Sequence, residues 1–416
     1  MQAIYQKDLV SHVSVNKGKI ALPFITVFAA FLLSIVFGEL DALVYVFFIG
    51  ISVLYGLLLN KYNNSPKLCF GLMLILVLYL TVFIGCRDFG VGTDTLVYID
   101  DYWQDANYVH SINDFNDFDY ISKAFLVLSM IGHLFSNDHQ ALLILTAFVI
   151  NFITFLSVYI FNYKRLQINW VIYIAIWQFL LMNNSMNLMR QYCSLSFMLL
   201  ALVLCLKRKF VIAIICAFIG YQFHGTSLIL SLLIVYYFLD NKLGPSKRNL
   251  ITILILIGLL IVVYSSFYYI SWLVSNGIIN DHFDSYTNND VSKGQNMFGV
   301  SYLAMSLLFI YLAIYLRKKK FISNSEQYYL ITVYGTSIIL RAAAFSLVFL
   351  ARLSESYTYI IYFILAYLLT KFSSKIPIIV QIMIYVVILY FWYNQIIIGG
   401  ATESYPYHSA ILGITI

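Results

Sequence analysis

Residues 68–85, LCFGLMLILVLYLTVFIG, form an apolar run without a charged side chain. About 20 such residues allow a helix to cross the roughly 30 Å of hydrocarbon in a bilayer. The run lacks the alternation of apolar and polar residues that marks the strands of a membrane β-barrel, so a helix is left as the way to satisfy its backbone groups in lipid. We therefore predict a transmembrane helix here.

Similar runs recur along the whole chain, which is 62% hydrophobic and only 11% charged over 416 residues. Soluble proteins are about 25% charged, so the composition excludes an ordinary soluble domain. The first run is followed directly by a second, unlike a cleavable signal peptide. We predict an all-α, polytopic membrane protein with about 13 spans, near residues 20–37, 42–59, 68–86, 140–161, 168–183, 189–206, 210–223, 226–239, 249–270, 298–316, 328–350, 356–370 and 376–398.

The distribution of charge predicts the orientation of these spans. With the N-terminus in the cytoplasm and the C-terminus in the periplasm, most basic residues fall in cytoplasmic connections, as the positive-inside rule requires. The net charge of +6 therefore needs no nucleic-acid partner. Residues 121–135 are too short to cross and are expected to be re-entrant or interfacial. We expect a single membrane domain over 1–416, with outer-face loops at 87–139 and 274–297.

Four of the eight arginines, but only two of the seventeen lysines, depart from this rule and fall on the outer side. They are Arg87, Arg190, Arg341 and Arg352. The planar guanidinium offers a fork of donors that suits phosphate. Arg352 follows Arg341 by eleven residues, close to three helical turns, which predicts one shared side if the helix is straight. Ion pairs with outer carboxylates, or snorkelling to head groups, are the alternative explanation.

A glycine-containing stretch, GCRDFGVGTDTLVYIDDYW at residues 85–103, follows the third predicted helix. Gly90 and Gly92 allow backbone N–H groups to turn toward an anion, and Asp94 and Tyr98 come next. No strand precedes the glycines, so this is not a dinucleotide fingerprint. The alternative is an ordinary glycine turn with solvated acids.

Two further polar clusters lie at the predicted outer rim. Met189-Arg190-Gln191 opens one span, and His224 lies in a turn between two short ones. An imidazole titrates near neutrality, which suits proton transfer, although a hydrogen-bonded turn histidine is the alternative.

Acidic loops at 114–119, with Asp117 and Asp119, and at 281–290 raise the question of a metal, but neither has EF-hand spacing. We favour solvated loops and predict no metal and no other cofactor.

Arginines, a histidine and a glycine turn at one face of a membrane domain are suited to an anionic head group carried on a lipid. Together with Thr93, Tyr357 and the closing Tyr405-Pro-Tyr407, these motifs occur along nearly the whole chain in an order that resembles the EpsG-like branch of the Wzy-type polysaccharide polymerases. Two features depart from the family pattern: loop 274–297 is modest, and Phe89 stands where another apolar or aromatic residue is usual.

The resemblance implies a lipid-dependent glycosyltransferase of the GT-C class in a bacterial inner membrane, with its active site facing the periplasm. Its substrate would be an oligosaccharide on undecaprenyl pyrophosphate, and a chain-length regulator is a possible partner. We assign catalytic roles in an inverting transfer to His224, Asp94, Arg190 and Arg341, with either His224 or Asp94 as the base. Substrate-binding roles go to Arg87, Arg352, Gln191, Tyr98, Gly90, Gly92, Thr93 and Tyr357. A flippase for lipid-linked sugars, an O-antigen ligase and an O-acyltransferase are the competing functions.

Overall fold

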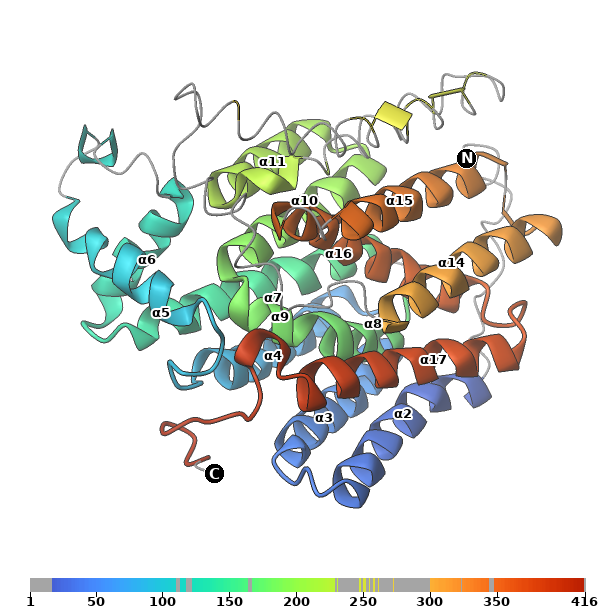
Figure 1. Cartoon of the computed structure of the whole chain (residues 1–416), viewed down its shortest axis with the longest axis horizontal. Helices are drawn as coiled ribbons and strands as arrows, with labels where there is room; N and C mark the ends of the chain where they lie inside the picture. Colours follow the sequence, from blue (N-terminus) through green and yellow to red (C-terminus); the bar gives the residue numbers. More distant parts are fainter. Residues whose placement is uncertain are drawn as a thin grey trace. The chain divides into compact units, whose positions relative to one another are not determined.

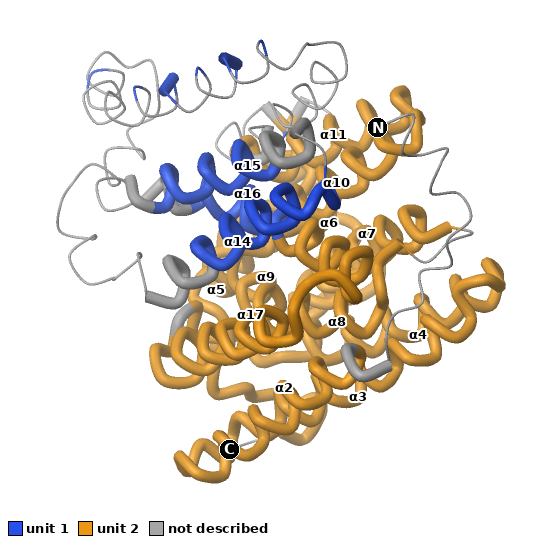
Figure 2. Tube along the Cα trace, turned by 90° about the vertical axis from the view of Figure 1, so that its right-hand side faces the viewer, with its two compact units in different colours: residues 1–10, 229–361 blue, residues 11–228, 362–416 orange. Residues whose placement is uncertain are grey.

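The computed structural model describes residues 17–109, 113–116, 122–163, 167–228, 300–322, 324–343 and 348–414, with a few isolated positions between 230 and 272. It divides into two compact units, coloured separately in Figure 2. Unit 1 comprises residues 1–10 and 229–361, and unit 2 comprises residues 11–228 and 362–416.

The described chain is built from helices, as Figure 1 shows. In chain order they are α2 (Lys17–Val36), α3 (Ala42–Lys61), α4 (Pro66–Gly85), α5 (Thr95–Tyr98), α6 (Lys123–Phe135), α7 (Gln140–Asn162), α8 (Trp170–Trp177), α9 (Asn183–Asn187), α10 (Met189–Leu206), α11 (Phe210–Phe223), α14 (Val300–Lys318), α15 (Asn324–Ala343), α16 (Val348–Lys371) and α17 (Ile378–Trp392). Three π-helical turns join them: η1 (Ile99–Trp103), η4 (Gln178–Met182) and η7 (Tyr393–Ile398). Short 3₁₀ turns are η2 (Asp105–Tyr108), η3 (Asn113–Asn116), η5 (Gly225–Leu228) and η8 (Ala401–Glu403).

Within these described ranges, six helices are long and apolar enough to cross a membrane: Ala42–Lys61, Pro66–Gly85, Gln140–Asn162, Met189–Leu206, Arg352–Lys371 and Ile378–Ile398. This confirms the helical class and agrees with a membrane protein. The predicted spans 226–239 and 249–270 and the loop 274–297 fall almost entirely outside the described residues. Within the segment expected at 121–135, Lys123–Phe135 form the 13-residue helix α6, which is shorter than a span.

Two predicted spans have different boundaries in the structure. The span expected over 168–183 continues through the π turn η4 and through α9, and it ends only at Leu188, whose ψ of 50° is not helical. The span expected over 328–350 corresponds to α15 as far as Ala343, and α16 runs without interruption from Val348 to Lys371, so the boundary expected between residues 350 and 356 was wrong. Hydropathy detects apolar length, but it does not detect a change in backbone hydrogen bonding within an apolar run.

Within unit 2, α7 packs against α4 and α10, and α10 packs against α11. Polar side chains fasten the helix ends. Asn169 caps α8 by accepting from Ile172 N at 3.3 Å, while Asn60 Nδ2 donates to the same amide oxygen at 3.0 Å. Within unit 1, α14 packs on α15 with the rings of Phe309 and Tyr334 stacked 4.7 Å apart. These contacts hold each unit together internally.

Where α4 meets α7, Gly85 allows the two backbones to approach closely. A Cβ built on Gly85 would lie 2.7 Å from Ile144 Cα, well inside normal carbon contact distance. Small residues permit such close helix packing in membranes. The absence of a side chain at Gly85 therefore allows α7 to cross close to the end of α4.

Gly85→Ala is expected to lower the free energy of unfolding by about 1–3 kcal/mol, because α4 and α7 must move apart. Gly71 lies on the same helix with open space at its Cβ position. Gly71→Ala should therefore leave stability unchanged or raise it slightly, since alanine favours helix. Melting temperatures of both variants in detergent micelles test this expectation, and equal shifts for the two would contradict it.

Candidate active site

Arg87, just after α4, is buried, with 1% of its surface exposed. Its Nη1 donates to the carbonyl of Ile84 at 2.6 Å, its Nη2 to that of Met186 at 2.7 Å, and its Nε to that of Val91 at 3.1 Å. Burial lowers the pKa of Arg87 to about 10, partly offset by Tyr407 and Tyr45, so the guanidinium is charged at neutral pH. Arg87 was predicted to bind substrate, but its guanidinium uses its donors to hold the surrounding loop.

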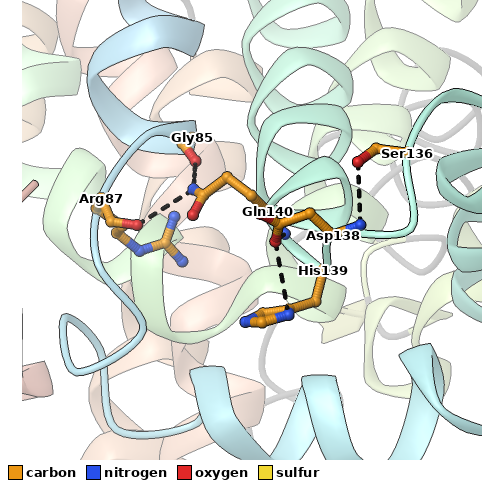
Figure 3. Close-up of polar contacts among 6 residues, drawn as sticks. All are labelled: Gly85, Arg87, Ser136, Asp138, His139 and Gln140. Carbon is orange, nitrogen blue, oxygen red and sulfur yellow. Dashed lines mark hydrogen bonds and ion pairs between the residues drawn. The ribbon is translucent and has the colours of Figure 1, made fainter. Parts of the chain in front are cut away.

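The start of α7 holds the backbone on either side of Arg87 (Figure 3). Gln140 Nε2 donates to the carbonyl of Gly85 and, at 3.2 Å, to that of Arg87. Asp138 Oδ1 in turn accepts from Gln140 N at 2.9 Å and lies 3.6 Å from His139 Nδ1. The end of α4 and the start of α7 are therefore joined through a side-chain amide.

The C-terminal tail covers the same loop. Asp88 N donates to the carbonyl of His408 at 2.9 Å, and Ala410 N donates back to Asp88 Oδ1 at 2.8 Å. Tyr407 is fully buried, and its hydroxyl donates to the carbonyl of Phe83 at 2.5 Å. The closing aromatic motif of the sequence is thus part of the packing behind the loop.

Gly90 and Gly92 differ in whether the backbone at their position requires a glycine. Gly92 has φ +103°, and a Cβ there would lie 2.9 Å from Thr95 Oγ1 and 3.0 Å from the carbonyl oxygen of Met186. Its N–H donates to Glu403 O at 2.9 Å, so the N–H faces the tail instead of an open anion site. Gly90 has open space at its Cβ position.

Gly92→Ala is expected to cost about 1–3 kcal/mol of stability, since an L-residue is strained at this φ and its methyl group meets the neighbouring carbonyl. Gly90→Ala is the matched control two residues away and should be close to neutral. Thermal unfolding of the purified proteins measures both. A Gly92→Ala protein as stable as the control would show that the loop does not need this conformation.

Arg190, at the start of α10, is the centre of a second cluster. Its Nη1 donates to the hydroxyl of Tyr102, and its guanidinium carbon lies 4.9 Å from the centre of the Tyr102 ring and 5.3 Å from that of Tyr98. Asp94 adds a favourable charge interaction. The Arg190 Nε is buried, and in the part of the chain that is described it donates to no acceptor. The cation is thus held on two aromatic rings with donor capacity remaining.

The neighbours of Arg190 are positioned by the loop and by α9. Asp94 N donates to Asn187 Oδ1 at 2.7 Å, and the Tyr98 hydroxyl lies 3.5 Å from Asp94 Oδ2. Tyr98 is buried, with 4% of its surface exposed, so its ring contacts Arg190 and the protein core and offers little surface to a sugar. Asp94 is partly exposed. Of this cluster, Asp94 and Arg190 are the residues that remain reachable.

His224 follows α11 and begins the turn that leads into η5. Its Nδ1 lies 2.6 Å from Thr226 Oγ1 and 3.4 Å from Thr226 N, which donates to it. Ser194 Oγ, one turn beyond Arg190 on α10, contacts the carbonyls of Gly220 at 2.5 Å and His224 at 3.3 Å. The histidine turn is therefore fastened to the helix that carries Arg190.

Tyr102 and Ser122 provide a second connection between the two clusters. The Tyr102 hydroxyl accepts from Ser122 N at 3.3 Å, and Ser122 Oγ contacts the carbonyls of Gln222 and Phe223 at 2.8 and 2.6 Å. Burial raises the pKa of Tyr102 against the opposing effect of Arg190, so the phenol is neutral. The loop between α4 and α6 thus links Arg190 to the end of α11.

Of the other predicted residues, Thr93 and Gln191 adjoin Asp94 and Arg190 in the chain, and three belong to unit 1. Gln191 is buried on α10, and Thr93 is exposed with its N–H donating to Thr402 O at 3.2 Å. Arg341 lies on α15, and Arg352 lies on α16 with the buried Tyr357, all in unit 1. The expectation that these two arginines share one face of a straight helix stays a prediction, because residues 344–347 between them lie outside the described ranges.

The sequence analysis did not single out four residues that build these clusters: Tyr102, Ser122, Asn187 and Ser194. Tyr102 follows Tyr98 by four residues, and Ser194 follows Arg190 by four, a spacing that puts side chains on one helix face. This spacing could have identified Tyr102 and Ser194 from the sequence. Ser122 and Asn187 contact partners about a hundred residues away and carry no local signal.

No group of three or more His, Cys, Asp or Glu side chains that could hold a metal ion occurs among the described residues. Asp117, Asp119 and the acidic loop 281–290 lie outside them.

The chain matches the family model of the EpsG family over residues 70–409. No curated protein and no solved structure gives a significant match. The matched range includes Arg87, the Arg190 and His224 clusters, Arg341, Arg352 and the Tyr405–Tyr407 motif. A match over most of the chain is decisive for its classification: the protein belongs to the EpsG family.

Proposed function

We propose that this protein is a polysaccharide polymerase that transfers the growing glycan from undecaprenyl pyrophosphate to the next lipid-linked repeat unit on the periplasmic face of a bacterial inner membrane. Membership of the EpsG family supports polymerisation of a polysaccharide in general terms. The apolar helices support a membrane location. The lipid carrier, the orientation and the inverting course are parts of the proposal.

The observation that carries the proposal is the Arg190 cluster. A guanidinium that lies against the rings of both Tyr98 and Tyr102 is preorganised, and its buried Nε makes no hydrogen bond within the described ranges. Preorganised donors stabilise charge that develops in a transition state without a reorganisation cost. A pyrophosphate leaving group develops such charge, and an arginine fork matches its oxygens.

The reaction we propose is a single displacement. A sugar hydroxyl of the incoming unit attacks the anomeric carbon of the growing chain, the bond from that carbon to the pyrophosphate oxygen breaks, and its electron pair leaves with the lipid pyrophosphate. Arg190 stabilises that charge, and a base, Asp94 or His224, takes the hydroxyl proton. Arg87 acts as a positioning residue for the loop. Roles for Arg341, Arg352 and Tyr357 stay predictions from the sequence.

Metal independence is part of the proposal, because a prepositioned guanidinium can provide the charge that a divalent cation provides in other transferases. EDTA is expected to leave the rate of the purified enzyme unchanged. The measurement is polymer formation from lipid-linked repeat units with and without the chelator, with magnesium or manganese restored as the control. Loss of activity that either metal restores would point to the acidic loops as a metal site.

The test of the function is product analysis in a strain that lacks the gene and is complemented with the wild-type chain or an Arg190→Ala variant. A missing polymerase leaves single repeat units on the lipid at the outer leaflet. A missing flippase leaves them on the inner leaflet, a missing ligase leaves polymer on its lipid carrier, and a missing O-acyltransferase leaves an unmodified polymer. Any of the last three outcomes rejects the proposal.

A further inference from the structure

We infer that Asn187 is a substrate-binding residue, whose side-chain amide nitrogen donates a hydrogen bond to the pyrophosphate of the lipid-linked substrate beside Arg190. The inference rests on the proposed function and adds one residue to its binding site. Asn187 is the last residue of α9, and it is half-buried.

The segment where α9 ends and α10 begins lies along the loop that follows α4. Met186 O accepts from Arg87 Nη2 at 2.7 Å, and Asn187 Oδ1 accepts from Asp94 N at 2.7 Å. Asp94 also has a favourable charge interaction with Arg190. Asn187 and Arg190, three residues apart in the chain, therefore both lie close to Asp94.

The contact with Asp94 fixes which way the amide of Asn187 faces. A backbone N–H can only donate, so the atom that faces Asp94 N is the oxygen Oδ1. The opposite assignment would set an N–H of the amide against the N–H of the backbone. Nδ2, the other arm of the planar group, therefore points away from Asp94 N with both of its protons.

Two side-chain donors at this place have no acceptor in the described part of the chain. Asn187 makes no hydrogen bond there besides the one with Asp94, so both protons of Nδ2 are unused. Arg190 Nε is buried and also donates to nothing within the described ranges. A buried donor without an acceptor is destabilising, and a ligand that supplies acceptors relieves it. A pyrophosphate presents acceptor oxygens and carries the charge that Arg190 complements.

The other explanation for Asn187 is that it only holds the loop. In that role only the amide oxygen matters, and a carboxylate could accept from Asp94 N in its place. If Nδ2 binds a phosphate oxygen, Asn187→Asp replaces the donor by a negatively charged oxygen that repels the ligand. The two roles therefore predict opposite orders of affinity for Asn187→Asp and Asn187→Ala.

The test measures the dissociation constant of undecaprenyl pyrophosphate, without sugars, for purified protein in detergent micelles. We expect Asn187→Ala to raise it about tenfold, as for loss of one hydrogen bond to a charged group, and Asn187→Asp to raise it about a hundredfold. Asn187→Asp should nevertheless melt above Asn187→Ala, because it keeps an acceptor for Asp94 N. Gln104→Glu makes the same chemical change at an exposed position of the loop and should leave the affinity unchanged.

An Asn187→Asp protein that binds the lipid pyrophosphate as tightly as the wild type, or more tightly than Asn187→Ala, overturns the inference. If Asn187→Asp does not fold, a folded Asn187→Ala protein with wild-type affinity overturns it instead. A raised KM for the lipid-linked repeat unit without a change in affinity for the pyrophosphate also overturns it, since the amide then binds a sugar. The proposed function fails separately, if a folded Arg190→Ala protein still makes normal polymer.

Discussion

Arg190→Ala is expected to lower the rate of polymerisation about a hundredfold to a thousandfold, with single repeat units accumulating on the lipid carrier. The Arg190 guanidinium lies against the rings of both Tyr98 and Tyr102. Its removal takes away both the charge and the fork of donors at the proposed leaving group. Product chains resolved by gel electrophoresis, and initial rates with purified protein, measure the loss.

Arg190→Lys separates charge from geometry. Lysine keeps the positive charge, but it cannot stack as a plane on two rings or donate as a fork. It should therefore recover little of the lost rate. Arg317→Ala is the matched control, since Arg317 lies in the last turn of α14, in a segment predicted to be cytoplasmic, and it should leave the rate unchanged. Full activity in Arg190→Lys would mean that charge alone is required.

Apolar length is what the sequence predicts best in this protein. The spans expected over 42–59, 140–161 and 189–206 correspond to α3, α7 and α10, at Ala42–Lys61, Gln140–Asn162 and Met189–Leu206. Their bounds follow from the local balance between apolar and polar residues. The π turn η4 depends on tertiary contacts and on backbone geometry, so hydropathy could not locate it.

The candidate site was also predictable only where local sequence determines it. Asp94, Tyr98 and Arg190 were chosen by residue type and by their place at helix ends, and the structure brings them together. The environment of Arg87 was not predictable. Its acceptors include Met186, 99 residues away, and its loop is covered by the tail near His408. Whether an arginine is open to substrate or enclosed by carbonyls depends on such distant segments.

The second large effect is expected for replacement of Arg87, and it concerns the stability of the protein. Arg87→Ala leaves the buried carbonyls of Ile84 and Met186 without this donor, while the Val91 carbonyl keeps its bond from Thr95 Oγ1. Each unsatisfied buried carbonyl costs about 1–3 kcal/mol, so we expect a loss of roughly 2 kcal/mol or more. Most of the variant should fail to accumulate as folded protein. Melting temperature and the yield of monodisperse protein in detergent measure this.

Two further variants decide between this role and direct binding of substrate. Arg87→Lys keeps a cation but cannot reach three separate carbonyls with one ammonium group as the guanidinium does, so it should be intermediate in stability. Lys67→Ala, an exposed change at the other end of α4, should be neutral. If Arg87→Ala is as stable as the wild type but inactive, the guanidinium serves the substrate and the loop must open during the reaction. If stability and activity fall together and Arg87→Lys restores both in proportion, Arg87 acts by holding the loop beneath Asp94 and Tyr98.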